Sequence, residues 1–295
     1  METINASIPA NVSNTELGQC DMHCRIILIT LYSMVLLGGT TGMLMMSRML
    51  FKRSSQSVVA TFVLSIIALH SILLVSLPFR VSYYFSVTWD LGSFTCWVVT
   101  SIIYSHMYFT FVFYVAIVIL RLFTYFKKLQ MQQLKKHHAV ALSMIIWTVG
   151  YLVFLPVFFL QYGTDPSHSE QQRCFEFYRD LNQRELIIMN YSVIVIMMAT
   201  VVILFLLQLV VIFQLVKALW PDMWTHQEYR AQIKSFFFLL VIVVCFIPHH
   251  AFRIHFIQNY SGRENSKLVH YNEICVALTT VCCLDMLCFT GGVIH

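Results

Sequence analysis

An arginine and a histidine lie close together in an otherwise apolar stretch late in the chain. His250 and Arg253 are three residues apart and Phe246 lies four residues before His250, so on a helix kinked at Pro248 their side chains share one face. A charge beside hydrocarbon usually faces a water-filled cavity or a partner, because its transfer into lipid is unfavourable. Arg253 is therefore a candidate anchor for a ligand phosphate or carboxylate. Two other roles stay open, extension to the outer membrane interface and pairing with Glu273.

Three more side chains would complete such a cavity. Arg80, soon after Pro78, would add a second positive charge, although it fits equally well an arginine that reaches for the interface. Tyr104 and Tyr108 would share a helix face and form an aromatic wall, although such stripes more often pack in a core. The predicted ligand site thus comprises Arg253, His250, Phe246, Tyr104, Tyr108 and Arg80.

The composition defines the elements that carry these residues. Of the 295 residues, 58% are hydrophobic and 11% charged, and the mean hydropathy is +0.72, which is too apolar for a soluble domain. A membrane-spanning helix needs about 20 predominantly apolar residues. Seven stretches have that length: 25–50, 57–80, 94–126, 139–160, 186–216, 231–257 and 268–292. Because lipid cannot hydrogen-bond the backbone, we predict an all-α bundle of seven transmembrane helices over residues 25–292, with the lipid bilayer as partner.

The loop charges predict the orientation, since Lys and Arg in short loops stay in the cytoplasm. One set of loops is mostly basic, with Arg48, Lys52, Arg53, Lys127, Lys128, Lys135, Lys136, Lys217, Arg230 and Lys234. The opposite loops are close to balance, so we place them and residues 1–24 outside the cell. The protein is thus expected to be a multi-pass protein of the plasma membrane.

Glycosylation signals agree with this orientation. Asn5, Asn11 and Asn259 each begin an Asn-x-Ser sequence on the predicted outer side. Asn190 also begins one, but at a helix entrance, and we interpret it as a chance match. We expect no removable signal peptide before the first span, which would itself direct insertion.

Two cysteines are predicted to form a disulfide. Cys96, at the outer start of the third span, and Cys174, in the long loop before the fifth, both face the oxidising side. Cys20 and Cys24 also face outward, and spacing alone leaves open whether Cys275 pairs with one of them.

In order and spacing, several motifs resemble those of the rhodopsin-like G-protein-coupled receptors. They are Trp89-Asp90-Leu91-Gly92 before Cys96, Arg121 placed 25 residues after that cysteine, Trp147, Cys245-Phe246-Ile247-Pro248, and Asp285-Met286-Leu287-Cys288-Phe289. The resemblance covers nearly the whole chain. It implies a receptor for an extracellular ligand that activates heterotrimeric G proteins through helix rearrangement.

Two further motifs are similar to the purinergic-type branch of that family, namely Leu77-Pro78-Phe79 and Pro248-His249-His250-Ala251-Phe252-Arg253. This resemblance favours an anionic ligand such as a nucleotide, a lipid or a carboxylate. Ile103 stands where amine receptors carry an aspartate, which disfavours an amine.

The resemblance also implies a cytoplasmic switch formed by Arg121, Glu228, Pro248, Asp285 and Phe289. We expect Arg121 to pair with Glu228 in the inactive arrangement, with a stabilisation of about 0–1 kcal/mol. The acid that precedes this arginine in the family is missing, and raised basal activity is our hypothesis from its absence.

Other positions depart from the family. His70 replaces the aspartate that helps bind sodium, so we expect an interior histidine that bridges to Asp285. Gly38 and Gly42 favour close helix packing rather than dimerisation. The chain ends at His295 without an amphipathic eighth helix, so residues 293–295 are interpreted as a truncated cytoplasmic end.

Other classes of protein fit less well. A transporter would show internal repeats or a polar row through the bundle, and we find neither. An enzyme is not expected, because the sequence has no His-Glu-x-x-His, Gly-x-Ser-x-Gly or P-loop motif. No nucleic-acid partner, cofactor or metal site is expected either. The main alternative is a receptor-shaped protein that binds a ligand without activating G proteins.

Overall fold

The structure is a computed structural model that describes residues 21–53, 58–127, 136–161, 174–175, 184–259 and 266–290. The predicted glycosylation sites Asn5 and Asn11 and the predicted end at 293–295 lie outside these ranges, as does Cys20. Asn259 is described and is exposed at the end of a helix.

Helices make up nearly all of the described chain. They are α1 (Met22–Arg53), α2 (Val58–Ser86), α3 (Gly92–Lys127), α4 (Lys136–Gln161), α5 (Arg184–Leu219), α6 (Gln227–Cys245), α7 (Ile247–Asn259), α8 (Ser266–Thr280) and α9 (Asp285–Thr290). Two 3-10 segments, η4 (Met223–Thr225) and η5 (Val281–Leu284), precede α6 and α9. No strand occurs in the described ranges, and the all-α prediction is confirmed.

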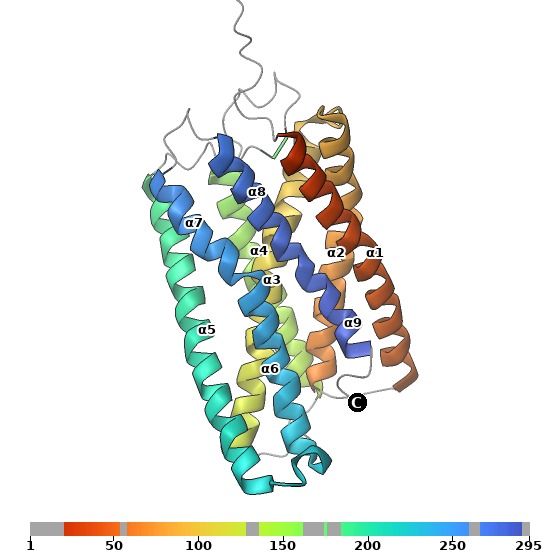
Figure 1. The fold of residues 1–295 in the computed structure, drawn as a ribbon, viewed down its shortest axis with the longest axis vertical. Helices are drawn as coiled ribbons and strands as arrows, with labels where there is room; N and C mark the ends of the chain where they lie inside the picture. Colours follow the sequence, from red (N-terminus) through yellow and green to blue (C-terminus); the bar gives the residue numbers. More distant parts are fainter. Residues whose placement is uncertain are drawn as a thin grey trace, which may run out of the picture.

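These helices form seven crossings of one bundle (Figure 1). Helices α1 to α5 are one crossing each, α6 and α7 form the sixth, and α8, η5 and α9 form the seventh. Six of the crossings, namely α1 to α5 and the pair formed by α6 and α7, are long and apolar enough to span a membrane. The seventh, predicted at 268–292, is divided instead into three short segments, of which α8 has 15 residues.

The sixth crossing bends where the sequence predicts a kink. Helix α6 ends at Cys245 and α7 begins at Ile247, with Pro248 in its first turn. A proline has no backbone N–H and its ring crowds the preceding turn, so the helix cannot continue straight through it. The outer half of this crossing carries His250 and Arg253, and both side chains are buried in the bundle.

Glycines let α1 approach the seventh crossing closely. A Cβ on Gly42 would lie 3.0 Å from the Cβ of Met286 and 3.1 Å from the backbone nitrogen of Leu287. A Cβ on Gly39 would lie 3.4 Å from the Cβ of Cys283. Side chains larger than hydrogen would push the two crossings apart, so these glycines serve packing within the chain.

A disulfide fastens the outer end of the bundle. Cys96, in the first turns of α3, is bonded to Cys174 as predicted, with their Cα atoms 5.7 Å apart. Cys24 is also disulfide-bonded. Cys275 is free, so it does not pair with Cys24.

Candidate functional site

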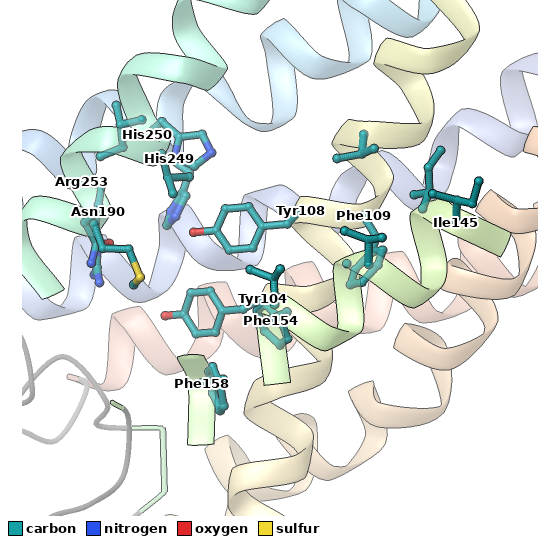
Figure 2. Close-up of a pocket in the computed structure, with 18 residues that line it drawn as sticks. Tyr104, Tyr108, Phe109, Ile145, Phe154, Phe158, Asn190, His249, His250 and Arg253 are labelled. Carbon is teal, nitrogen blue, oxygen red and sulfur yellow. The ribbon is translucent and has the colours of Figure 1, made fainter. Parts of the chain in front are cut away.

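A cavity of about 670 Å³ lies between α3, α4, α5 and α7. Its polar end is formed by His249, His250 and Arg253 of α7 with Asn190 of α5. The hydroxyl groups of Tyr104 and Tyr108 point from α3 toward that end (Figure 2). The other lining residues are apolar: Phe109, Val112, Ile145, Ile146, Val149, Gly150, Val153, Phe154, Phe158, Met189, Val193 and Ile194.

Arg253 is the charged group of this cavity. Its side chain is 5% exposed, and its Nη1 donates a hydrogen bond to Oδ1 of Asn272 at 3.2 Å. Its Nε donates a longer one, of 3.5 Å, to Oδ1 of Asn190. The guanidinium also lies 5.4 Å from the ring centre of Phe256. All of these partners are uncharged.

The ion pair between Arg253 and Glu273, one of the alternatives left open by the sequence, is not formed in the structure. Among the described residues, no carboxylate lies within ion-pair distance of Arg253. Glu273 instead accepts a hydrogen bond of 3.0 Å from the hydroxyl of Tyr84. Arg253 does not extend to the outer membrane interface either, because it is buried inside the bundle.

Four of the six predicted ligand residues line the cavity: Tyr104, Tyr108, His250 and Arg253. Phe246 does not line it, because it caps the end of α6 at the bend and is fully buried there. It lies four residues before His250, but its side chain is part of the main hydrophobic core.

Arg80, which was predicted as part of the ligand site, does not line this cavity. It is 2% exposed and lies under the loop after the disulfide, with its Cζ 4.0 Å from the ring centre of Phe175. Its Nη1 donates a long hydrogen bond of 3.5 Å to the hydroxyl of Tyr32. Arg80 therefore joins α1, α2 and the outer loop, and it neither reaches the interface nor contributes charge to the cavity.

The sequence interpretation missed several residues of the site. Asn190 was read as a chance glycosylation signal, yet its side chain is buried and accepts from Arg253. Asn272, on α8, holds the same arginine from the other side. For both asparagines, the sequence offered one signal, which is a polar residue inside a predicted membrane helix. The apolar walls on α4 carry no such signal, because they look like any lipid-facing helix.

At the cytoplasmic end, the predicted pair of Arg121 and Glu228 is not formed. Glu228 is exposed in the first turn of α6, and no ion pair joins it to Arg121 in the described ranges. The connection between α3 and α6 runs through Gln232 instead, whose Nε2 donates to the backbone oxygen of Arg121 at 3.4 Å. Gln208 of α5 donates to Oε1 of Gln232 at 2.9 Å, so one amide chain links three helices.

In the middle of the bundle, Asp285 is buried at the start of α9. Its Oδ2 accepts a hydrogen bond from the hydroxyl of Tyr114, and its Oδ1 lies 3.4 Å from Nε2 of His70. The bridge expected between His70 and Asp285 is therefore in place. Phe289 lies in α9, but its side chain is outside what the structure describes.

The structure is a seven-helix membrane bundle with an outer disulfide. A cavity lies in its outer half, and an arginine lies at the inner end of its third helix. Together these features define a membrane receptor. The profile of the rhodopsin family of seven-transmembrane receptors matches residues 42–286. The human protein named "Probable G-protein coupled receptor 141" is 36% identical over 281 residues, which cover 94% of this chain and 92% of that protein. The chain belongs to the rhodopsin family of seven-transmembrane receptors.

More distant relatives lie in the same family. The mouse protein named "Probable G-protein coupled receptor 34" is 24% identical over 88% of this chain and 72% of its own length. Cysteinyl leukotriene receptor 1 of Cavia porcellus is 25% identical over 99% of this chain and 88% of its own length. The protein is thus a multi-pass receptor of the plasma membrane that responds to an extracellular ligand and acts on a G protein, and it is not an enzyme.

Proposed function

We propose that this receptor binds an amphiphilic ligand with an anionic head group, and that binding activates heterotrimeric G proteins. The observation that carries the proposal is the environment of Arg253, a buried cation whose partners are two neutral amides and an aromatic ring. A buried charge is stable when a counter-charge pairs with it. A phosphate or carboxylate in the cavity would supply that counter-charge and accept two hydrogen bonds from the guanidinium.

The rest of the cavity favours a ligand with an apolar body. Beyond the polar end, its walls are aliphatic and aromatic side chains from α3, α4 and α5. A small, fully hydrophilic anion would leave that surface in contact with water, whereas a hydrocarbon chain would cover it and gain about 25 cal/mol per Å² of apolar area buried. These apolar walls favour lipids and other amphiphiles over nucleotides among the anionic classes.

The α4 wall also gives the apolar part access to the membrane. Ile145, Val149 and Val153 follow one another at intervals of four residues and line the cavity, yet they are 56%, 54% and 61% exposed. In a bilayer this exposed surface faces hydrocarbon. A ligand chain would therefore lie against α4 in contact with the lipid chains, with its head group at Arg253.

The test uses a panel of single-chain amphiphiles that carry a carboxylate or a phosphate head group. Their neutral alcohol analogues and a set of nucleotides serve as controls, and G-protein activation is measured with the wild-type receptor and with Arg253→Gln and Arg253→Lys. We expect activation by chains with an anionic head group only. Potency should fall by at least about tenfold in Arg253→Gln, because hydrogen bonds to charged groups contribute about 1.5–3 kcal/mol, and less in Arg253→Lys.

Each other result has a defined meaning. Activation by nucleotides without a chain would contradict the apolar part of the proposal. Equal potency on the wild type and on Arg253→Gln, at matched surface expression, would contradict the anchor. Ligand-induced thermal stabilisation of the purified receptor without activation of any G protein would instead support a binding protein that does not signal.

A further inference from the structure

Four buried side chains with metal-ligating atoms meet in the centre of the bundle, away from the ligand cavity. They are His70 of α2, His106 of α3, and Cys282 and Cys283 of η5. One ligating atom from each lies within 4.8 Å of the other three. All four residues are at most 1% exposed.

The local fold brings the two cysteines to the same place. In an α-helix, consecutive side chains point about 100° apart, and only one of two neighbours usually faces a given site. The seventh crossing changes to a 3-10 turn at Val281–Leu284, and both Cys282 and Cys283 are buried in it. Gly39 of α1 packs against this turn, since a Cβ there would lie in van der Waals contact with the Cβ of Cys283, at 3.4 Å.

One nitrogen stands at the centre of the cluster. His106 Nε2 is 2.8 Å from Nδ1 of His70 and 3.7 Å from Sγ of Cys283. A ring nitrogen has a single in-plane position for either a proton or a lone pair. His106 Nε2 can therefore make one good hydrogen bond, whereas two groups, His70 Nδ1 and Cys283 Sγ, approach it. A cation placed among these atoms would accept lone pairs from all of them.

The other nitrogen of His70 has the partner that metal-bound histidines have. His70 Nε2 lies 3.4 Å from Oδ1 of Asp285, whose second oxygen accepts from Tyr114. Histidines that bind metal through one nitrogen generally donate the other N–H to a carboxylate, which fixes the ring and raises its basicity. Within the described part of the chain, neither His70 Nε2 nor Asp285 Oδ1 has a hydrogen-bond partner, so the two atoms lie at ion-pair distance and each has its hydrogen-bonding position open to the other.

We propose that His70, His106, Cys282 and Cys283 form a binding site for a tetrahedral transition-metal ion, with Zn²⁺ as the best match. Two imidazoles and two cysteine sulfurs are a common ligand set of structural zinc sites. On binding, the metal replaces the two thiol protons, which pass to solvent. The two thiolates then offset the charge of Zn²⁺, which lowers the cost of holding the ion inside a membrane bundle.

Such a site would fasten α2, α3 and the seventh crossing to one another at mid-depth. Its ligands come from three segments far apart in the chain, without the short spacing of a zinc motif, so the sequence pattern does not predict the site. This site shares no residue with the lining of the Arg253 cavity.

The test measures metal binding by the purified full chain in detergent or nanodiscs. We expect about one zinc ion per protein in elemental analysis after purification with added Zn²⁺, as in structural sites. Replacement with Co²⁺ should give the absorption of thiolate-to-cobalt charge transfer and of tetrahedral cobalt. The melting temperature should rise on addition of Zn²⁺ and fall again with a chelator.

Variants then assign the site. Cys283→Ser and His106→Gln should lose the cobalt absorption and the zinc-dependent rise in melting temperature. Cys275→Ser, which removes a free cysteine of α8, and His255→Asn, which removes an exposed histidine of α7, should retain both. The wild-type spectrum alone keeps the proposal testable if a variant does not fold. Absence of zinc and of thiolate-to-cobalt absorption in folded wild-type protein would overturn it, as would binding that Cys283→Ser leaves unchanged.

Discussion

At the scale of single residues, this receptor places polar groups where their partners come from other helices. Tyr114 is fully buried on α3, and its hydroxyl donates to Asp285, which lies 171 positions later in the chain. The histidine bridge to the same carboxylate could be predicted, because His70 and Asp285 occupy positions that are matched in the family. The tyrosine could not, because apolar spacing gives the helix but not its rotation about its own axis.

Tyr114→Phe should lower the stability of the receptor by about 1–3 kcal/mol, because it leaves a buried carboxylate oxygen without its donor. The measurement is thermal unfolding of the purified protein. Tyr125→Phe is the matched control, since it removes a hydroxyl that donates to Gln214 at an exposed position. A loss of stability as large in Tyr125→Phe would show that the burial of the Tyr114 bond does not matter.

At the scale of elements, the apolar stretches predicted the existence and order of the crossings, because membrane thickness sets their length. The division of the seventh crossing at η5 was not predicted, since no proline or glycine marks it. Arg80 and Arg253 looked alike in the sequence, as single arginines near the outer end of an apolar stretch. Arg253 lines the cavity and Arg80 does not, because packing decides which face of α2 and of α7 turns inward.

Helix α4 approaches α3 at Gly150, and an alanine there should be destabilising. Its Cβ would lie 2.3 Å from Cε1 of Phe109, whose ring is held between Trp147 and Tyr151 at centroid distances of 5.6 and 4.7 Å. We expect Gly150→Ala to cost about 1–3 kcal/mol in thermal unfolding despite the better helix propensity of alanine. The displaced ring would also narrow the cavity.

The control for this substitution is Thr148→Ala, on an exposed position of the same helix. It should leave the unfolding temperature nearly unchanged. An increase in the stability of Gly150→Ala, as expected for alanine in an uncrowded helix, would contradict the close approach of Phe109.

A second prediction at the scale of elements concerns the amide chain at the cytoplasmic end. Gln232→Leu removes the donor to the Arg121 backbone and the acceptor for Gln208, both of which hold α6 against its neighbours. With about 1 kcal/mol per hydrogen bond, the equilibrium between closed and open inner ends should shift by a factor of about 5–30. Basal G-protein activation at matched surface expression should rise accordingly.

Gln227→Leu changes an exposed glutamine at the start of α6 and should not alter basal activation. The double variant Gln232→Leu with Arg121→Ala should lose the increase, because the family resemblance assigns Arg121 to the cytoplasmic switch. A basal signal that is the same in the wild type and in Gln232→Leu would remove the role of the amide chain in the switch.

At the scale of the whole molecule, the outer disulfide organises the end of the bundle that faces the extracellular medium. It holds Phe175, in a left-handed backbone conformation with φ 71°, over the buried guanidinium of Arg80. This conformation is strained for a non-glycine residue and needs support from its surroundings. Tyr83, Tyr84 and Trp89 provide that support, with ring centroids between 5.1 and 6.2 Å from that of Phe175.

Cys174→Ser should therefore destabilise the receptor and reduce its amount at the cell surface. The bond closes a loop of 78 positions, for which about 2–4 kcal/mol is typical. Cys275→Ser, which removes a free cysteine, is the control and should express like the wild type. Equal melting temperatures of Cys174→Ser and the wild type would show that aromatic packing alone holds the outer end.

The exposed α4 wall of the cavity has a consequence for pharmacology. A ligand that reaches Arg253 along Ile145, Val149 and Val153 is drawn from the bilayer, where amphiphiles accumulate, rather than from the surrounding water. The dose that matters is then the mole fraction of the ligand among the membrane lipids. The same compound would appear weak in an assay rich in membrane and strong in a dilute one, and its effect would outlast a wash of the medium for as long as the lipid phase retained it.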